Sequence, residues 1–180
     1  MTKIHCFDDI YIKLLLPEDV TEEYVSWIND SETNKYLVTQ KTSLNECKKY
    51  VLNKYKDNNT VFYGIYHNER HIGNIKIEKI DNKLKCGCLG IMIGNKNYRS
   101  KGYGTKIINF FCKYSFDTLN LNLILLGVLK ENIRAIKCYL KCGYKEIKNI
   151  NLVNSKIVND YLIKYKFIND DERIYMILVK

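Results

Sequence analysis

Three strand-like segments, separated only by short turns, most constrain the fold of this chain. Residues 60–67 and 70–80 are rich in β-branched and aromatic residues, and the polar Asn68 and Glu69 between them predict a hairpin. The turn signal Asp81-Asn82 leads into the third segment, residues 83–94. We therefore expect three consecutive antiparallel strands in the middle of the chain.

Helices and further strands flank these three strands. Pro17 suits the first turn of one helix. Thr42 or Ser43 caps a second, which has a capping-box start with Glu46 three residues beyond Ser43, and Gly143 supplies the left-handed end of a third. In chain order we expect a strand at 11–16, helices at 17–30 and 42–55, the three central strands, a helix at 104–119, a strand at 121–129, a helix at 131–143, and strands at 144–150, 160–167 and 173–180.

The composition fits one globular domain over residues 1–180. Hydrophobic residues make up 46% and charged residues 27% of the 180, which is typical of a folded, soluble chain. Pro17 is the only proline, and no linker, repeat or low-complexity segment divides the sequence. No apolar run reaches the roughly 20 residues that span a bilayer, and no secretory signal is expected. We therefore expect a cytoplasmic protein without a membrane partner.

The net charge and the cysteines narrow the choice of partners. A formal charge of +9 favours an anionic partner, but lysines are spread among apolar residues and no nucleic-acid motif is present, so we expect no nucleic acid. The seven cysteines cannot all pair, and their spacing lacks the paired C-x-x-C pattern of a zinc site. We expect free thiols and no metal.

The segment Tyr98–Gly104, YRSKGYG, has two competing interpretations. It lies between an expected strand and an expected helix, whose first N–H groups have no partners inside the helix. Gly102 and Gly104 would let the backbone approach a phosphate, and Arg99 and Lys101 add positive charge. A plain turn is the alternative. Ile107 stands where a dinucleotide motif needs its third glycine, and no Walker sequence is present.

A second sequence block decides in favour of the phosphate site. Residues 99–104 match [QR]-x-x-G-x-[GA], and the downstream pattern N-x-x-A-x-x-x-Y-x-K-x-G-[FY] is filled by Asn132, Ala135, Tyr139, Lys141, Gly143 and Tyr144. This pair of motifs resembles the GNAT superfamily of acyl-CoA N-acyltransferases over roughly residues 10–150. Segments 27–37, 71–77 and 114–128 are similar to the branch of ribosomal-protein N-terminal and amino-sugar acetyltransferases.

The resemblance implies a fold and a cofactor. It implies an α/β (α+β) GNAT fold: a mixed, mostly antiparallel sheet of about seven strands, splayed at the cofactor site and flanked by about four helices. Residues 60–150 would form its motif core. The implied cofactor is acetyl-CoA (coenzyme A), and its binding residues would be Ile91, Met92 and Ile93 for the pantetheine arm, Arg99, Ser100, Lys101, Gly102, Tyr103, Gly104 and Thr105 for the pyrophosphate, and Asn132.

The resemblance also implies a direct transfer of the acetyl group to an amine. An amide of the 91–93 strand would polarise the thioester carbonyl. Tyr139 would be the general acid for the leaving thiolate, since a free tyrosine keeps its proton at neutral pH. The alternatives are a core tyrosine at Tyr139 and a simple helix cap at Asn132.

The general base and the acceptor stay open in the sequence. The strand at 85–94 lacks the acid that many relatives use, so Glu78, His67 or Asp30 are candidates that could act through water. The expected acceptor-pocket residues are Trp27, Asn29, Asp30 and Glu78, with helix packing and capping as the alternative for the first three.

We expect the acceptor to be the primary amine of a small molecule, such as a nucleotide-linked amino sugar. The N-terminal amine of a ribosomal or other protein is the first alternative, and a CoA-binding module without turnover is the second. The frequent use of Asn, Lys and Ile suggests a bacterial source. A homodimer is possible, because many relatives form one.

Overall fold

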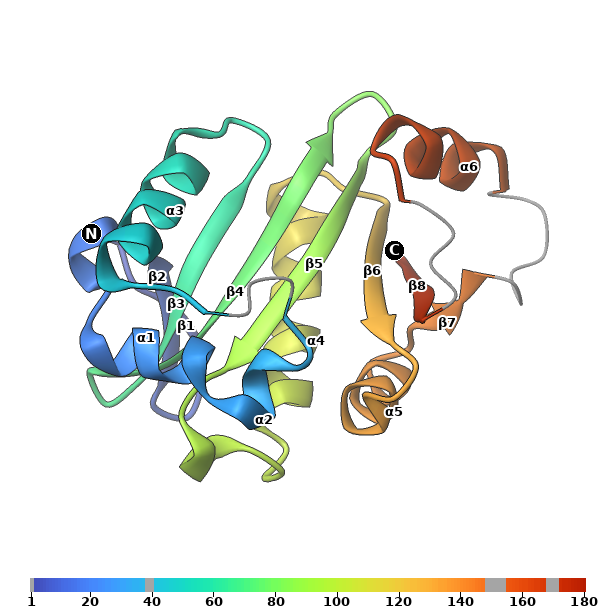
Figure 1. Cartoon of the computed structure of the whole chain (residues 1–180). Coiled ribbons are helices and arrows are strands. Elements are labelled where there is room, and N and C mark those ends of the chain that lie inside the picture. The colour runs from blue at the N-terminus through green and yellow to red at the C-terminus, as the bar shows by residue number, and fades with distance from the viewer. Residues whose placement is uncertain (1, 38–40, 148–154, 168–171) are drawn as a thin grey trace. The chain divides into compact units, whose positions relative to one another are not determined.

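The computed structural model describes residues 2–37, 41–147, 155–167 and 172–180 (Figure 1). These residues form two compact units. The first contains Met1–Glu78 and Gly90–Gly104, and the second contains Lys79–Leu89 and Thr105–Lys180. Three elements run through both: strand β4 (Arg70–Asp81), strand β5 (Cys86–Ile93) and helix α4 (Tyr103–Thr118).

The strands form one mixed sheet in the order β1-β2-β3-β4-β5-β6-β8-β7. The pair β5 and β6 is parallel, whereas β1–β2, β2–β3, β3–β4, β6–β8 and β7–β8 are antiparallel. This confirms the expected mixed, mostly antiparallel sheet and adds one strand to the number expected. The remaining strands are β1 (Ile4–Phe7), β2 (Ile10–Leu14), β3 (Val61–His67), β6 (Leu123–Leu129), β7 (Lys145–Glu146) and β8 (Arg173–Val179).

In the first unit, local signals set most of the boundaries. Ser43 and Glu46 close the capping box of α3 (Leu44–Lys56) as predicted. Asn68 and Glu69 both have positive φ, 46° and 64°, which is the geometry of a tight type I′ hairpin turn between β3 and β4. The strand β1 was missed because its four residues carry too short a pattern to separate it from a loop.

The helix predicted at 17–30 is divided into two shorter helices, and a third follows it. A 3-10 turn, η1 (Pro17–Asp19), comes first, and α1 (Glu22–Asn29) starts only after Thr21, whose side chain accepts a hydrogen bond from the Tyr24 amide. A short helix α2 (Ser31–Asn34) follows from Asp30. The cap at Thr21 interrupts a pattern whose acidic and apolar residues otherwise suit one continuous helix.

The core of the first unit joins α1 and α3 to the sheet. Its buried members are Leu15, Val20, Tyr24, Val25, Trp27, Cys47, Val51 and Phe62. Gly94, which follows β5, allows one close contact: a Cβ at this position would lie only 2.1 Å from the Trp27 indole. The indole therefore lies directly against the backbone that leads from β5 into the YRSKGYG segment.

The second unit contains β6, β8 and β7 with α5 (Ile133–Lys141) and α6 (Ser155–Lys164), drawn from orange to red in Figure 1. β6 pairs with β8 along its whole length, from Leu123 with Val179 to Leu129 with Arg173. Its recorded pairing with β5 covers only Leu123–Leu125. Gly143 ends α5 with a φ of 85°, as its position after the helix predicted.

The strand predicted at 160–167 is wrong, because most of this segment belongs to α6. Tyr161, Ile163, Tyr165 and Phe167 alternate as in a strand, but Val158 and Tyr161 are buried together and Ile163 is 76% exposed. Burial therefore follows the helical spacing of Val158, Tyr161, Leu162 and Tyr165. The strand at 173–180 is confirmed, and the predicted strand at 144–150 lies partly outside the described residues.

No helix in the described ranges is long and apolar enough to cross a membrane.

Candidate active site

The YRSKGYG segment forms a left-handed turn at the start of α4. After β5 the chain makes a 3-10 turn, η2 (Lys96–Tyr98), and then Ser100 and Gly102 take positive φ angles of 59° and 83°. A Cβ at Gly102 would meet nothing within 4 Å, so the space above this residue is open. Ser100, Lys101 and Gly102 are exposed.

This turn gathers backbone donors. Among the described residues, no backbone carbonyl accepts a hydrogen bond from the amides of residues 100–102. The first N–H groups of α4 follow them directly and have no acceptor within the helix. Successive unpaired N–H groups at a helix start are the donor set that an anionic diphosphate requires. The residues of the first unit therefore fit the pyrophosphate of the cofactor.

The Arg99 side chain braces this turn through hydrogen bonds. Its Nε donates to the Ile93 carbonyl at 2.8 Å, and one terminal nitrogen donates to the Gly94 carbonyl at 2.7 Å and to the Thr33 hydroxyl at 2.8 Å. Its own amide donates to the Lys96 carbonyl, and only 10% of its side chain is exposed. The structure thus shows Arg99 as a brace of the turn, and its contact with the pyrophosphate stays a prediction.

Aromatic rings anchor the first residue of α4. The Tyr103 ring lies 5.4 Å from Tyr98 and 6.4 Å from His67 between centroids. The Tyr98 hydroxyl and His67 Nδ1 are 2.8 Å apart and hydrogen-bonded. Sequence analysis missed this cluster because it joins β3 to the turn across more than 30 residues. Its effect is to hold the start of α4 against the β3–β4 hairpin.

Three of the expected acceptor residues make structural contacts around α1. Trp27 is only 7% exposed and packs in the core. The Asn29 side chain bonds the Thr42 backbone twice, at 2.9 Å in each direction. Asp30 accepts from Lys96 at 2.9 Å, and this hydrogen bond lowers its pKa. These contacts match the packing alternative for Trp27 and make Asp30 a weak base.

Glu78 lies in a separate cluster on β4. It accepts hydrogen bonds from Lys54 of α3 at 2.6 Å and from Lys76 at 2.7 Å. Burial opposes its ionisation, but the two lysines outweigh burial and keep its pKa below the ordinary value. Glu78 is therefore a paired carboxylate in a cluster of net positive charge.

His71 is enclosed by aromatic rings near the same core. Its ring lies 4.8 Å from Tyr66, 5.2 Å from Trp27 and 5.8 Å from Tyr24 between centroids. Its Nε2 is hydrogen-bonded to the Gly73 carbonyl at 2.8 Å, while Nδ1 is buried and has no hydrogen-bond partner among the described residues. Burial lowers the pKa of His71 to about 4.

The second unit holds the downstream motif on α5. Asn132 caps this helix by accepting from the Ala135 amide at 3.2 Å. Tyr139 is half-buried, with its ring 5.9 Å from Tyr144. Burial, followed by the neighbouring Cys138 and Cys142, raises the pKa of Tyr139, so the hydroxyl keeps its proton throughout the neutral range.

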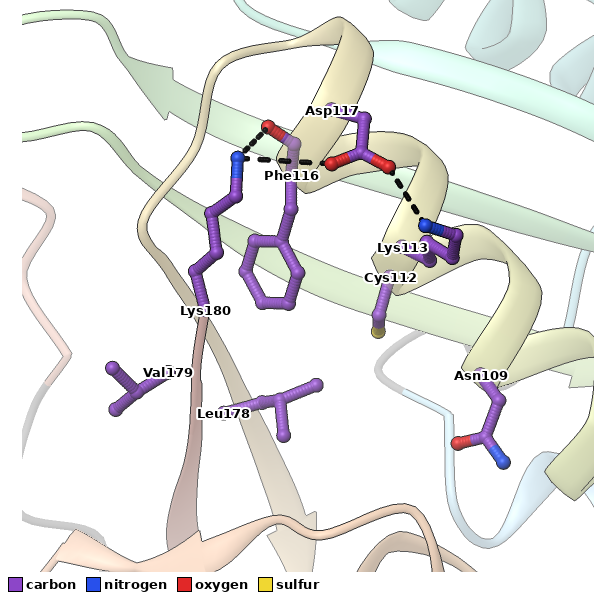
Figure 2. Close-up of a pocket in the computed structure, with 8 residues that line it drawn as sticks. All are labelled: Asn109, Cys112, Lys113, Phe116, Asp117, Leu178, Val179 and Lys180. Carbon is purple, nitrogen blue, oxygen red and sulfur yellow. Dashed lines mark hydrogen bonds and ion pairs between the residues drawn. The ribbon is translucent and has the colours of Figure 1, made fainter.

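A hollow of about 300 Å³ lies elsewhere in the second unit, between α4 and the end of β8 (Figure 2). Figure 2 shows Asp117 between Lys113, at 3.2 Å, and Lys180, at 3.7 Å. These charges are satisfied by one another, and no residue predicted for the site lines the hollow. Within the described part of the chain, no group of His, Cys, Asp and Glu could hold a metal.

The donor-rich turn of the first unit and the capped α5 of the second unit carry the two sequence motifs that resemble an acyltransferase. The sequence model of the Acetyltransferase (GNAT) domain matches residues 10–145. The chain therefore belongs to the GNAT acetyltransferase family, as its resemblance predicted, and is an N-acetyltransferase.

Named relatives agree with this assignment. Acetyltransferase PseH of Campylobacter jejuni is 26% identical over 113 residues, which are 63% of this chain and 69% of PseH. Spermidine N-acetyltransferase from Vibrio cholerae, solved with CoA and spermine, has a TM-score of 0.74 at 22% identity over 95% of both chains. The Microcin C7 self immunity acetyltransferase MccE, solved with acetyl-CoA and AMP, has a TM-score of 0.74 at 16% identity over 97% of this chain and 94% of MccE. These structures support the fold and agree with the expected cofactor.

The buried His71 predicts a loss of stability in mild acid. Its pKa is depressed in the folded chain, so below about pH 6.5 the unfolded chain binds a proton that the folded chain does not. Between pH 7.5 and 5, this difference should cost about 2 kcal/mol of unfolding free energy. Urea unfolding at both pH values should show a smaller loss in His71→Gln than in the wild-type protein. His67→Gln is the matched control, and an unchanged pH dependence in His71→Gln would contradict the prediction.

Proposed function

We propose that this chain transfers the acetyl group of acetyl-CoA to the primary amine of a small anionic molecule, with a nucleotide-linked amino sugar as the leading acceptor. The proposal that acetyl-CoA is the acetyl donor rests on the open turn at residues 100–104, where unpaired amides meet the start of α4. Acetyl-CoA supplies an activated thioester. The protein supplies the donors that hold its diphosphate and the groups that move protons.

Each binding residue has a distinct part in this proposal. The amides of Ser100, Lys101 and Gly102, with those at the start of α4, hold the diphosphate, and the exposed Lys101 side chain adds charge. Arg99 acts through the turn that it braces. The backbone of Ile91–Ile93 at the end of β5 pairs with the pantetheine arm, and Asn132 orders the first turn of α5.

Tyr139 is proposed as the general acid. A hydroxyl with a raised pKa is fully protonated at neutral pH, and it can give its proton to a thiolate as that group leaves. Of the proposed bases, Asp30 and Glu78 are weakened by their lysine partners. His67, hydrogen-bonded to Tyr98, is the remaining candidate to take the proton of the amine, directly or through water.

Charge favours an anionic acceptor over a polyamine. The chain carries a formal charge of +9. The carboxylates that the sequence assigned to the acceptor are each paired with a cation, Asp30 with Lys96 and Glu78 with two lysines. A cationic acceptor such as spermidine needs unpaired carboxylates to bind. A sugar linked to a nucleoside diphosphate instead brings negative charge to a positive protein.

A panel of amines tests the acceptor. Purified protein and acetyl-CoA should acetylate UDP- or dTDP-linked amino sugars at least about tenfold faster, by kcat/KM, than spermidine or a peptide with a ribosomal-protein N-terminus. Thiol release and the mass of the product are the readouts. Preference for the peptide would establish the first alternative, and CoA binding without thiol release on any amine would establish a binding module.

A substitution at Gly102 tests whether the turn at residues 100–104 binds the diphosphate. Gly102→Ala places a methyl group where the diphosphate approaches, so affinity for CoA should fall by about tenfold in calorimetric titration. Gly143→Ala is the matched control: it has a similar φ of 85°, and its Cβ meets only Leu178 at 3.5 Å. Both variants should lose about 1–2 kcal/mol of stability through strain. Equal CoA affinities of the Gly102→Ala and Gly143→Ala variants would refute diphosphate binding by this turn.

A substitution of Tyr139 tests its role as the general acid. Tyr139→Phe should lower kcat by about a hundredfold and leave the Kd for CoA within about twofold, because only the proton donor is removed. Tyr144→Phe is the control, since this buried neighbour also loses a hydroxyl, which bonds the Cys112 thiol at 3.3 Å. It should lose stability and keep its turnover. Normal turnover of Tyr139→Phe would remove Tyr139 from the mechanism.

A further inference from the structure

Two thiols from the end of α5 converge on a single residue of α4. Cys138 lies in the last turn of α5, and Cys142 is the C-cap residue four positions later. The Cys138 sulfur is 3.3 Å from the Thr105 hydroxyl, and the Cys142 thiol donates to the Thr105 carbonyl at 3.6 Å. All three residues belong to the second unit. Thr105 is the third residue of α4 and directly follows the Gly104 of the donor-rich turn.

The two thiols differ in character. The neighbouring Cys142 thiol, with help from the Thr105 hydroxyl at 3.3 Å and from Lys141, lowers the pKa of Cys138 against the effect of burial. The neighbouring Cys138 and burial raise the pKa of Cys142. Cys138 is half-buried and Cys142 is 8% exposed. The pair thus combines a half-buried sulfur whose pKa is lowered with a buried sulfur whose pKa is raised.

The other thiols offer a contrast. Burial raises the pKa of Cys6 and of Cys86 to about 12, that of Cys112 to about 11, and also that of Cys47. Cys6 is half-buried like Cys138. Exposure alone therefore does not distinguish Cys138 from Cys6, whereas the neighbouring Cys142 thiol and Thr105 hydroxyl do.

We propose that Cys138 and Cys142 form a thiol-modification site, in which the Cys138 thiolate attacks a low-molecular-weight disulfide and Cys142 resolves the adduct. In the first step the Cys138 sulfur bonds to one sulfur of the disulfide R–S–S–R, whose S–S bond breaks and releases one thiolate. In the second step the Cys142 proton passes to water, the Cys142 sulfur attacks that of Cys138, and the second thiolate leaves. The two cysteines are oxidised to a disulfide, and the small disulfide is reduced to two thiols.

A disulfide between Cys138 and Cys142 can form at the end of α5, but it would be strained. Residues four apart on a helix have Cβ atoms about 5–6 Å apart, whereas a disulfide needs about 4 Å, so the last turn must tighten. Cys142 lies where the helix is already irregular: its amide is directed at the carbonyls of both Cys138 and Tyr139, and Gly143 then leaves the helix. A strained disulfide is easily reduced, which makes the modification reversible.

The modification would disturb the start of α4. Oxidation removes the sulfur contacts to both the hydroxyl and the carbonyl of Thr105, and it tightens the turn of α5 that carries Tyr139. This consequence rests on the proposed function, in which α4 begins at the diphosphate turn. The thiol chemistry itself does not depend on that function.

Alkylation tests the thiolate in the whole protein without cofactor. With limiting iodoacetamide at pH 7, peptide mass spectrometry should show Cys138 labelled at least about a hundredfold faster than Cys6, because thiolate is the reacting species. Cys142→Ala should slow labelling of Cys138 by about threefold or more, while Cys142→Ser, which keeps a donor, should restore most of the rate. Equal labelling of Cys138 and Cys6 would overturn the proposal.

Oxidised glutathione tests the exchange. The wild-type protein should form a disulfide between Cys138 and Cys142, Cys142→Ser should stop at a glutathione adduct on Cys138, and Cys138→Ser should form neither. Absence of both products from the wild-type protein and from Cys142→Ser would also overturn the proposal.

CoA titration of the reduced and oxidised forms then tests the coupling to α4. Oxidation should weaken binding by about tenfold. Equal binding by both forms would refute the coupling, whereas no binding by either form would refute the proposed function and not the thiol site.

Discussion

The site depends on how the chain is held as it leaves β5 and enters α4. Arg99 donates to two successive carbonyls, those of Ile93 and Gly94, and to the Thr33 hydroxyl of α2. Because the Ile93 and Gly94 carbonyls accept hydrogen bonds from Arg99, they point toward its side chain. The amides of residues 100–102 remain as donors. A charged hydrogen bond of this kind contributes more than a neutral one and is costly to remove when buried. The brace therefore exposes a row of N–H groups in a fixed order.

Two carboxylates of the first unit are each approached by two cations. Glu78 is shared by two lysines, and Asp30 is approached by Lys96 and by the Arg99 guanidinium. Both acids are thus paired with positive charge. This arrangement suits an enzyme whose donor carries a diphosphate and whose proposed acceptor carries another. It also lowers the pKa of Asp30 and of Glu78, the two acids that the sequence offered as general bases.

Local signals in the sequence predicted most elements, and contacts between distant residues decided the rest. The capping box at Ser43, the left-handed Gly143 and the cap at Asn132 depend on neighbours within a few residues, so the sequence alone identifies them. The segment 160–167 could not be assigned in that way, because its alternation suits a strand and only packing of Tyr161 against the sheet selects a helix. In the site, the glycines and the motif order were predictable. The acceptors of Arg99 and the approach of Thr105 to Cys138 were not, since they join segments that no local pattern connects.

The contact of Trp27 with Gly94 sets a limit on how this chain can vary. The indole occupies the volume in which any side chain at position 94 would lie, so the two positions can change only as a pair. A smaller residue at 27 would leave a void unless position 94 gained a side chain to fill it, and a larger residue at 94 would expel the indole. Homologous chains that keep this backbone path should therefore have either a bulky aromatic residue at 27 with glycine at 94, or a compact residue at 27 with a larger residue at 94. A bulky residue at both positions, or a small one at both, should be rare.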